Sequence, residues 1–269
     1  GTTYARFSSF VRKPSVVARY TAELVSGRAR AHVGHNPLGA VMIVTLLAIL
    51  ALLGASGLVV LGGALKHGPL AFTTSFAVGV TARRLHEVLA YGLVALIGLH
   101  VAGVLIESWR TRTNLIAAML GGRKRLTGRE HAEPGIAGRP GTAVGVAVVL
   151  TSSAALGMTH LSAKPALGVP TAPLHPTYAK ECGACHTAHH PSLASAATWR
   201  ALMSGLGDHF GENAELPAQM VAELSHYLGQ DAAERWDTAA AHVLRAASAR
   251  SEEHTSELQS PYVISYAVF

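Results

Sequence analysis

Long stretches without charged residues dominate the first 161 positions of the chain. About 20 consecutive apolar residues suffice for a helix to cross a membrane, and three stretches reach that length: 38–63, 86–106 and 142–161. The first has no ionisable residue, the second is apolar apart from two histidines and one glutamate, and the third is rich in Val, Ala and Gly. We therefore predict three transmembrane helices.

The remainder of the chain alternates apolar and polar positions with a helical period. Four prolines within residues 162–177 predict an extended tether. Apolar residues then recur at helical spacing from Ser192 to Leu206, after Pro217, and from Ala232 to Ala247. The pattern predicts an all-α protein: a membrane helical bundle fragment of three spans, followed by a small helical domain over residues 178–249.

The basic residues predict the orientation of these spans. Residues 1–37 carry six Lys and Arg and residues 107–141 carry seven, whereas residues 64–85 between them carry three. The positive-inside rule places the first two segments in the cytoplasm and everything after residue 161 outside, at a bacterial inner membrane. The basic pI of about 9.6 is then explained by topology and contact with membrane lipid, and no nucleic-acid partner is expected.

Both cysteines of the chain lie in one pentapeptide, Cys182-Gly-Ala-Cys185-His186. A C-x-x-C-H run is typical of c-type haem attachment, in which each thiol forms a thioether to a porphyrin vinyl group and the adjacent imidazole binds the iron. A redox-active or structural disulfide and a Cys2His2 zinc site are the alternatives. Haem c is attached outside the bacterial cytoplasm, which agrees with the predicted orientation.

Two histidines within the second predicted span are candidate metal ligands. His86 and His100 are 14 positions apart, so on a helix they share one face and are separated by roughly 21 Å. Ionisable residues inside a span are functional candidates by default, and this spacing would suit two haems near opposite membrane surfaces. The alternative is a structural role, with His100 bonded to a neighbouring helix and His86 at the membrane interface.

Several motifs in residues 4–125 together resemble the bacterial cytochrome b561 / nickel-hydrogenase b-type cytochrome family. They are Tyr4-Ala-Arg-Phe-Ser-Ser-Phe-Val11, Gly34-His-Asn-Pro-Leu-Gly39, Leu85-His-Glu-Val-Leu-Ala90, Leu99-His-Val-Ala-Gly103 and Gly121-Gly-Arg-Lys-Arg125. The resemblance implies a four-helix core with two haems b held by paired histidines, the last helix supplying His86 and His100. The first two helices of that core are missing here, so either the reading frame is incomplete, which we expect, or another chain supplies the missing ligands. His35 could substitute as a ligand, but we expect it to flank the first span.

Residues from Glu181 onward resemble the dihaem cytochrome c family. The matching runs are Glu181-Cys-Gly-Ala-Cys-His186, Trp199-Arg-Ala-Leu-Met203 and Asp208-His-Phe-Gly-Glu-Asn-Ala214. The family motif makes His209 the first choice for the sixth iron ligand. The other possible ligands are Met203, Met220, His189, His190 and His226. The second C-x-x-C-H of that family is absent, and residues 250–269 resemble translated sequencing adapter, so we also expect truncation at this end.

The predicted organisation is a cytoplasmic juxtamembrane segment (1–37), a b561-like region (38–125), a cytoplasmic loop (126–141), a third span (142–161), a tether (162–177), a periplasmic cytochrome c domain (178–249) and a probable artefact (250–269). We expect haem c and haem b to carry electrons between the quinone pool, or a membrane dehydrogenase or hydrogenase, and a periplasmic redox protein. The alternatives are a quinone reductase that oxidises superoxide or another small molecule, with Lys66, Arg83 and Arg84 as a cationic approach, and a haem sensor or membrane anchor subunit.

Overall fold

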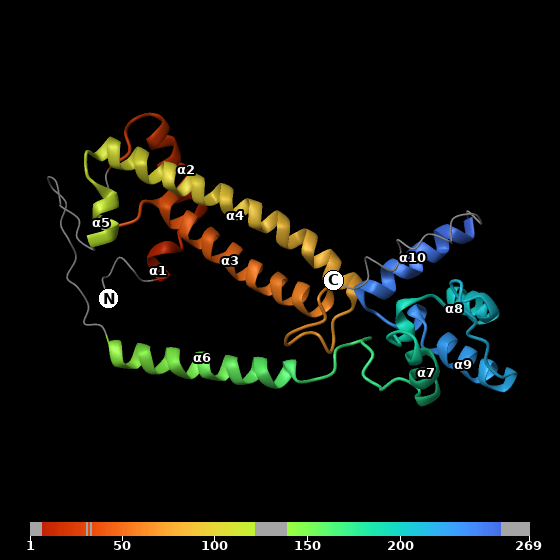
Figure 1. The fold of residues 1–269 in the computed structure, drawn as a ribbon. Coiled ribbons are helices and arrows are strands. Elements are labelled where there is room, and N and C mark those ends of the chain that lie inside the picture. The colour runs from red at the N-terminus through yellow and green to blue at the C-terminus, as the bar shows by residue number, and fades with distance from the viewer. Residues whose placement is uncertain (1–6, 31, 33, 122–138, 254–269) are drawn as a thin grey trace. The chain divides into compact units, whose positions relative to one another are not determined.

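The computed structural model of the protein describes residues 7–30, 32, 34–121 and 139–253, and in these ranges it is helical (Figure 1). No β-strand forms within those ranges; they contain one isolated bridge, between His209 and Glu212. The α-helices are α1 (Phe7–Phe10), α2 (Pro14–Val25), α3 (Pro37–Gly63), α4 (Phe76–Thr111), α5 (Leu115–Gly121), α6 (Pro140–Ser162), α7 (Pro176–Glu181), α8 (Ala196–Ser204), α9 (Ala218–Gln230) and α10 (Ala239–Glu253). The predicted all-α class is confirmed.

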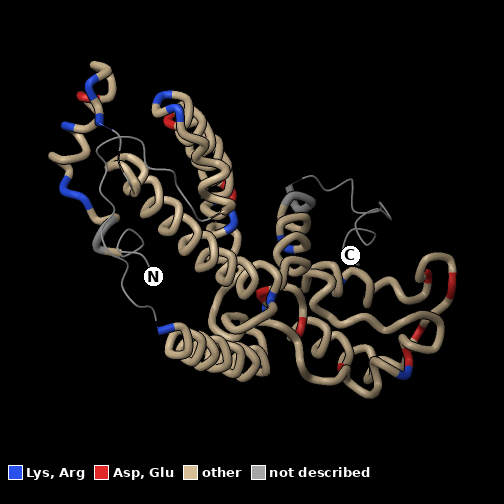
Figure 2. Tube along the Cα trace, turned by 90° about the vertical axis from the view of Figure 1, so that its left-hand side faces the viewer, with Lys and Arg blue, Asp and Glu red and all other residues tan. Residues whose placement is uncertain are grey.

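Three of these helices are long and apolar enough to cross a membrane: α3 with 27 residues, α4 with 36 and α6 with 23. Each contains one of the three predicted spans, and α3 and α6 begin at a proline, which suits the first helical position. In Figure 2 charged residues are absent along α3 and lie toward the two ends of α4. The helix α4 begins at Phe76, ten residues before the predicted span 86–106, because the largely apolar residues 76–82 and the basic pair Arg83 and Arg84 continue the same helix.

The chain divides into two compact units, which we describe separately: residues 1–57 with 83–154, and residues 58–82 with 155–269. The first unit holds most of α3 and α4, packed as an antiparallel pair (Figure 1). The second unit holds the end of α3, the start of α4 and the loop between them, together with the small C-terminal helical domain. The loop that joins α3 to α4 therefore belongs to the same unit as the Cys-x-x-Cys-His motif.

Glycines bring the end of α3 and the start of α4 into backbone contact. A methyl group added at Gly79 would lie 2.2 Å from the amide nitrogen of Ala64, and one added at Gly63 would lie 2.7 Å from the Gly79 Cα. Small residues of this kind permit close helix packing in membranes, where no hydrophobic effect drives helices together. The crossing point of α3 and α4 is therefore fixed by residues that have no side chain.

The C-terminal domain packs α7, α8 and α9 around a small core. Tyr178, Met203, Leu224 and Leu228 are buried together, and a second cluster joins Ala233 to Ala241 and Leu244 of α10. Such a small domain has a marginal hydrophobic core, and a covalently attached porphyrin would add to it.

The predicted helix Ala232–Ala247 is wrong in its first turns. The chain forms a short 3-10 turn, η5 (Ala233–Arg235), and α10 begins only at Ala239. The reason is local hydrogen bonding: the Thr238 hydroxyl accepts from the Ala241 amide at 3.2 Å and caps α10, while the Trp236 indole donates to the Asp231 carbonyl at 2.9 Å. This break places Asp237 between two helical elements.

The Pro-rich segment is not a free tether along its whole length. Its Leu167 amide donates to the Ala71 carbonyl at 2.8 Å, and the Gly168 carbonyl accepts from the Asp237 amide at 2.9 Å. The Lys164 ammonium also lies 4.5 Å from the centroid of the Phe72 ring. The segment therefore packs against the α3–α4 loop before α7 begins at Pro176.

Some predictions fall outside the described residues. They concern the residues before Phe7, residues 122–138 and residues 254–269. The second of these segments includes the basic residues 123–125 of the last b561-like motif and most of the predicted cytoplasmic loop, and the third includes most of the predicted artefact. Helix α10 continues to Glu253, past the predicted domain end at 249.

Candidate haem-binding sites

The Cys-x-x-Cys-His motif forms the tightened end of a helix. Helix α7 ends at Glu181 and passes directly into the 3-10 turn η2 (Cys182–Ala184). Residues three apart on such a turn lie on one side, so Cys182 and Cys185 are neighbours along one edge. Both thiols are free; that of Cys182 is half-buried and that of Cys185 is exposed. Two adjacent free thiols, one against the core and one at the surface, suit attachment to a porphyrin edge.

The environment of Cys182 is apolar. Its side chain packs against the core formed by Tyr178, Met203 and Leu224. Burial, and secondarily the charge of Glu181, raises the pKa of the Cys182 thiol. The Tyr178 hydroxyl donates to the His189 carbonyl at 2.7 Å, and burial raises the pKa of Tyr178 well above its usual value. These residues form an apolar side of the site, which would keep water from a porphyrin held there.

The His186 imidazole is prepared for metal binding through one nitrogen. Its Nδ1 lies 2.9 Å from the Thr187 carbonyl oxygen. Because a carbonyl oxygen can only accept, this contact places the hydrogen on Nδ1 and leaves the lone pair of Nε2 available. Hydrogen bonds of this type orient metal-bound histidines in many proteins.

His209 is held opposite His186 by a strained hairpin turn. The His209 amide donates to the Glu212 carbonyl at 2.8 Å, and the Glu212 amide donates back at 3.2 Å. The two residues between them, Phe210 and Gly211, have φ angles of 56° and 90°. A positive φ is costly for a bulky residue such as phenylalanine, and strain of this kind is often maintained at functional sites. Asp208 stabilises the turn by accepting from the Gly211 amide at 3.1 Å.

The two imidazoles have the separation expected of axial ligands on one iron. Their ring centroids are 6.3 Å apart, and their planes differ by 23°. Metal–imidazole bonds are about 2 Å long, and a ring centroid lies roughly 1 Å behind its nitrogen, so two imidazoles on opposite sides of one iron have centroids about 6 Å apart. The residues present therefore fit a haem held by Cys182, Cys185, His186 and His209.

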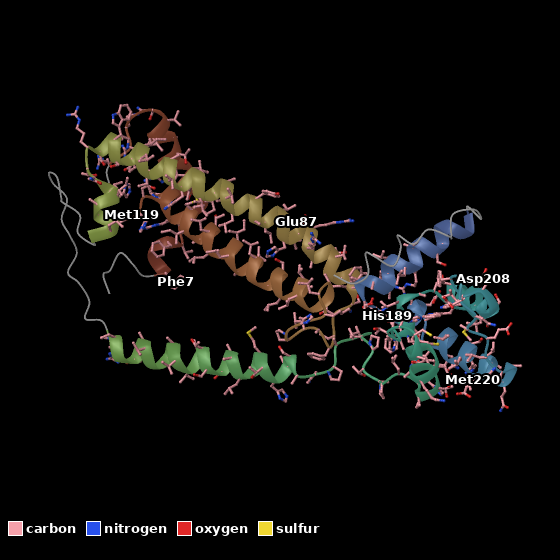
Figure 3. The ribbon with its side chains drawn as sticks, in the orientation of Figure 1. Phe7, Glu87, Met119, His189, Asp208 and Met220 are labelled. Atoms are coloured by element: carbon pink, nitrogen blue, oxygen red, sulfur yellow. The ribbon has the colours of Figure 1, made fainter. Side chains whose placement is uncertain are left out.

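The alternative sixth ligands have other roles in the structure. Met203 is buried in the core and Met220 packs against it. The His190 Nδ1 accepts from the Ser192 amide at 3.1 Å, and the His226 Nε2 lies 3.1 Å from the Gln230 amide nitrogen. Figure 3 shows where two of these alternatives, His189 and Met220, lie in the domain, and where Asp208 lies, the residue before His209. Among the candidates, the ring contact places only His209 opposite His186 in the described domain.

The histidines of α4 lie on the face that packs against α3. His86 and His100 are both half-buried, whereas Leu85 and Leu99 beside them are exposed. The His86 Nδ1 is 3.0 Å from the hydroxyl of Ser56, which is itself buried. A methyl group added at Gly57 would lie 3.3 Å from the His86 Cε1. The backbone of α3 thus comes close to one side of the His86 ring because position 57 is glycine.

The structure brings His35 close to His100, which sequence reasoning did not expect. Burial, and secondarily the proximity of the His100 imidazole, lowers the pKa of His35. The Phe10 ring lies edge-on to His35, with ring centroids 5.4 Å apart. Consecutive spans run antiparallel, so the start of α3 lies beside the end of α4. This pairing of the two predicted spans could have predicted from the sequence that His35 lies near His100. His35 and His100 are a candidate ligand pair.

Two of the three basic residues that could guide an anionic substrate toward His86 already form ion pairs. Lys66 forms an ion pair with Asp237 at 2.7 Å and is only 8% exposed, and Arg83 pairs with Glu87 at 3.2 Å. In the described residues no group of three or more His, Cys, Asp or Glu side chains comes together, so the Cys2His2 zinc alternative is not assembled there.

Comparison with known proteins separates the chain into two regions. Residues 3–122 match a family described as prokaryotic cytochrome b561, and residues 178–265 match one described as dihaem cytochrome c. A solved structure, described as DHC purified from Rhodobacter sphaeroides, is 31% identical, covering 36% of this chain and 84% of its own, with a TM-score of 0.24. No curated protein matches significantly. The second match runs through residues 250–265, so it lends no support to an adapter origin of that segment.

Proposed function

The chain joins a region of the prokaryotic cytochrome b561 family, residues 3–122, to a region of the dihaem cytochrome c family, residues 178–265, and from this premise we propose that it carries electrons between membrane quinone and a redox protein outside the inner membrane. The two regions make it a b/c-type cytochrome of electron transfer. The chain's contribution is to ligate, bury and space the haems, which supply the one-electron chemistry when bound.

The paired imidazoles at residues 186 and 209 are the observation that carries this proposal. A haem with two protein ligands has no open position for substrate or gas, so this site suits electron transfer better than catalysis or sensing. The half-exposed setting of the motif, with Cys185 at the surface, also suits exchange with an external partner. The membrane end of the route would use His86 and His100, with His35 near His100 as a further candidate ligand.

The basic segments support the proposed location. With the N-terminus and residues 107–141 in the cytoplasm, an odd number of crossings leaves the haem c domain on the periplasmic side. Haem c attachment outside the cytoplasm requires the same arrangement. On this topology the His35–His100 end of the helix pair is the inner end, and the α3–α4 loop is the outer one.

We place the quinone headgroup near Tyr20 at the inner end. Tyr20 is only 4% exposed, and its hydroxyl has no hydrogen-bond partner among the described residues. The Asn36 side chain lies near that hydroxyl and acts to lower the pKa of Tyr20, and its amide oxygen also accepts from the Gly39 amide at 2.7 Å. Burial and the charge of Glu107 raise the pKa of Tyr20, so it stays a neutral donor. A buried hydroxyl that makes no close hydrogen bond within the described residues suits a quinone carbonyl.

The residues around Tyr20 provide polar groups for proton movement. Glu107 binds Arg110 through two contacts, of 2.8 and 3.0 Å, and Arg110 also donates to the Ala29 carbonyl at 2.7 Å. The ring of Tyr20 lies edge-on to His32, with centroids 5.3 Å apart. Oxidation of one quinol releases two electrons and two protons; the electrons leave one at a time through the haems, and the protons enter water at this surface.

The test is quinol-driven reduction of haem c in the purified, haem-loaded chain. A short-chain ubiquinol is mixed anaerobically with oxidised protein, and the haem c absorbance is followed by stopped flow. We expect reduction of haem c to the level that dithionite gives, and a higher KM for quinol in Tyr20→Phe. Tyr91→Phe is the matched control, because Tyr91 is exposed on α4. The proposal is wrong if quinol does not reduce haem c and quinone does not reoxidise reduced haem c.

A further inference from the structure

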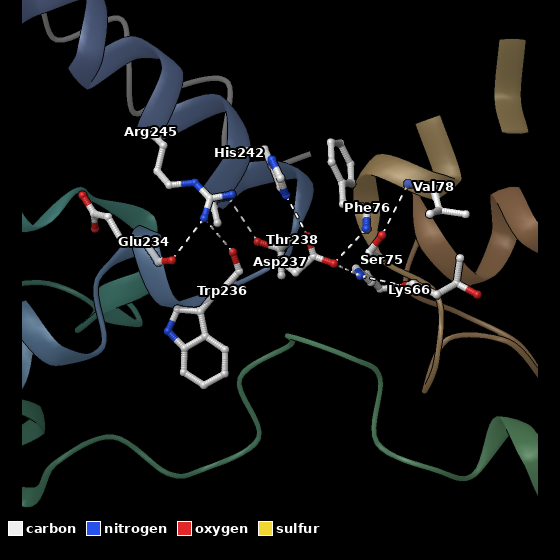
Figure 4. A network of polar contacts seen from close by, with 12 residues as sticks. Lys66, Ser75, Phe76, Val78, Glu234, Trp236, Asp237, Thr238, His242 and Arg245 are labelled. Atoms are coloured by element: carbon white, nitrogen blue, oxygen red, sulfur yellow. Dashed lines mark hydrogen bonds and ion pairs between the residues drawn. The ribbon is translucent and has the colours of Figure 1, made fainter. Parts of the chain in front are cut away.

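Three donors from two distant parts of the chain converge on Asp237. Its Oδ2 accepts from the Lys66 ammonium at 2.7 Å and from the Phe76 amide at 2.8 Å, while its Oδ1 lies 2.8 Å from the His242 Nε2 (Figure 4). Lys66 and Phe76 flank the loop between α3 and α4, whereas Asp237 and His242 belong to the C-terminal domain. One carboxylate therefore joins the domain to the membrane hairpin.

On the hairpin side of this contact, backbone conformation and hydrogen bonds hold the donors in place. Lys66 has a φ of 56°, in the left-handed region that lysine rarely adopts, and its ammonium also donates to the Thr74 carbonyl at 3.2 Å. The Phe76 amide is the first of α4, where unpaired amides and the helix dipole favour a negative charge. The loop thus offers a cation and a helix start to the same carboxylate.

The domain side adds ring packing and backbone contacts. The His242 imidazole stacks on the Phe76 ring, with centroids 4.5 Å apart and planes 26° apart. The Asp237 amide donates to the Gly168 carbonyl at 2.9 Å. A methyl group at Gly168, whose φ is 67°, would lie 2.4 Å from the Asp237 Cβ. Asp237 is therefore held by its own backbone as well as by its side chain.

We propose that Asp237 is a positioning residue that docks the haem c domain onto the α3–α4 loop and the first turn of α4, and that this docking speeds electron transfer between the membrane haems and haem c. This inference rests on the proposed electron-transfer function. Electron transfer between haems weakens steeply with distance. Without docking, the Pro-rich segment alone would limit the position of the domain, and the productive arrangement would be one of many.

The contact differs from an ordinary surface ion pair. Exposed pairs contribute little, since water and salt screen them, but the Lys66 side chain is only 8% exposed and that of Asp237 26%. Loss of the carboxylate charge would leave a buried ammonium without a counter-charge, which is strongly unfavourable. Three hydrogen bonds also fix the direction of the contact, which a single long-range attraction would not.

The test uses the haem-loaded full chain in detergent or liposomes and compares Asp237→Asn with wild type. The matched control is Asp231→Asn, which removes a carboxylate from the same domain that pairs with Arg235 at 2.6 Å. For Asp237→Asn we expect quinol-driven haem c reduction to slow by roughly tenfold or more. Haem content, spectra, midpoint potentials and haem b reduction should stay unchanged. Amide hydrogen exchange at residues 164–169 should accelerate in this variant alone.

The charge-swapped pair Lys66→Asp/Asp237→Lys guards against a folding defect, because it should recover part of the rate that either single swap loses. Wild-type rates and exchange in Asp237→Asn would overturn the inference, and so would equal losses in Asp231→Asn. Failure of wild-type haem c to accept electrons from quinol would refute the proposed function instead. In that case hydrogen exchange still decides whether Asp237 docks the domain.

Discussion

Substitution of Gly79 by alanine tests whether the backbone contact between α3 and α4 sets the membrane hairpin. The added methyl would lie 2.2 Å from the Ala64 nitrogen and 2.5 Å from the Gly63 carbonyl carbon. Ordinary carbon contacts are about 3.5 Å or longer, so the helices would have to separate locally by roughly 1 Å. The obstructing atoms are backbone and cannot rotate away.

The expected cost follows from the size of this clash. Overpacking in a well-packed site costs about 1–3 kcal/mol. An alanine also favours a helix over glycine by about 0.5–1 kcal/mol, which acts in the opposite direction. Gly98→Ala has the second effect alone, because nothing lies within 4 Å of its added methyl. The difference between the two variants therefore isolates the clash, and we expect it to be about 1–3 kcal/mol.

The measurement is unfolding of the detergent-solubilised full chain, followed by far-UV circular dichroism as SDS is added. Gly98 suits the control because it lies on α4, two residues and hence about 200° around the helix from His100. Gly79→Ala should also loosen the docking contact, since Phe76 lies one turn before it on α4. Equal stability of the two alanine variants, within about 0.5 kcal/mol, would refute the close-packing argument.

Three further predictions concern single side chains. His209→Ala should convert haem c from a low-spin to a high-spin spectrum that added imidazole restores, whereas His226→Ala should leave the spectrum unchanged; a low-spin spectrum in both would exclude His209 as the ligand. Burial raises the pKa of Asp237, but hydrogen bonds from Lys66, His242 and the Phe76 amide outweigh it and hold the pKa below its ordinary value of 3.8. The carboxylate's stabilising contribution is therefore complete above about pH 4 and is lost as the pH falls through the lowered pKa. Hydrogen exchange at residues 164–169 should accordingly accelerate only below about pH 4. Asp237→Asn, in which the domain is already undocked, should show no such acceleration. Leu228→Ala should lower the unfolding free energy of the haem c domain by about 2–5 kcal/mol, because Leu228 is fully buried; Val243→Ala, at an exposed position, should change it by less than about 0.5 kcal/mol.

Local patterns predicted the elements well where one interaction dominates. Uncharged stretches longer than a bilayer requires could only be long apolar helices, and α3, α4 and α6 follow them. The prediction was wrong at Trp236–Thr238, where apolar periodicity continues but a threonine cap and an indole hydrogen bond break the helix. Such short-range competition between side chain and backbone is not visible in hydrophobic spacing.

The sequence by itself determined the helical class, the haem c motif and the identity of most candidate ligands, because these depend on composition and on spacing along one element. Only the tertiary structure decided which residues meet across elements. It brought His209 opposite His186 through a strained turn at Phe210, His35 near His100, and Asp237 onto Lys66 over 171 positions. Contacts at such separation depend on how the chain folds back on itself, and no local period encodes that.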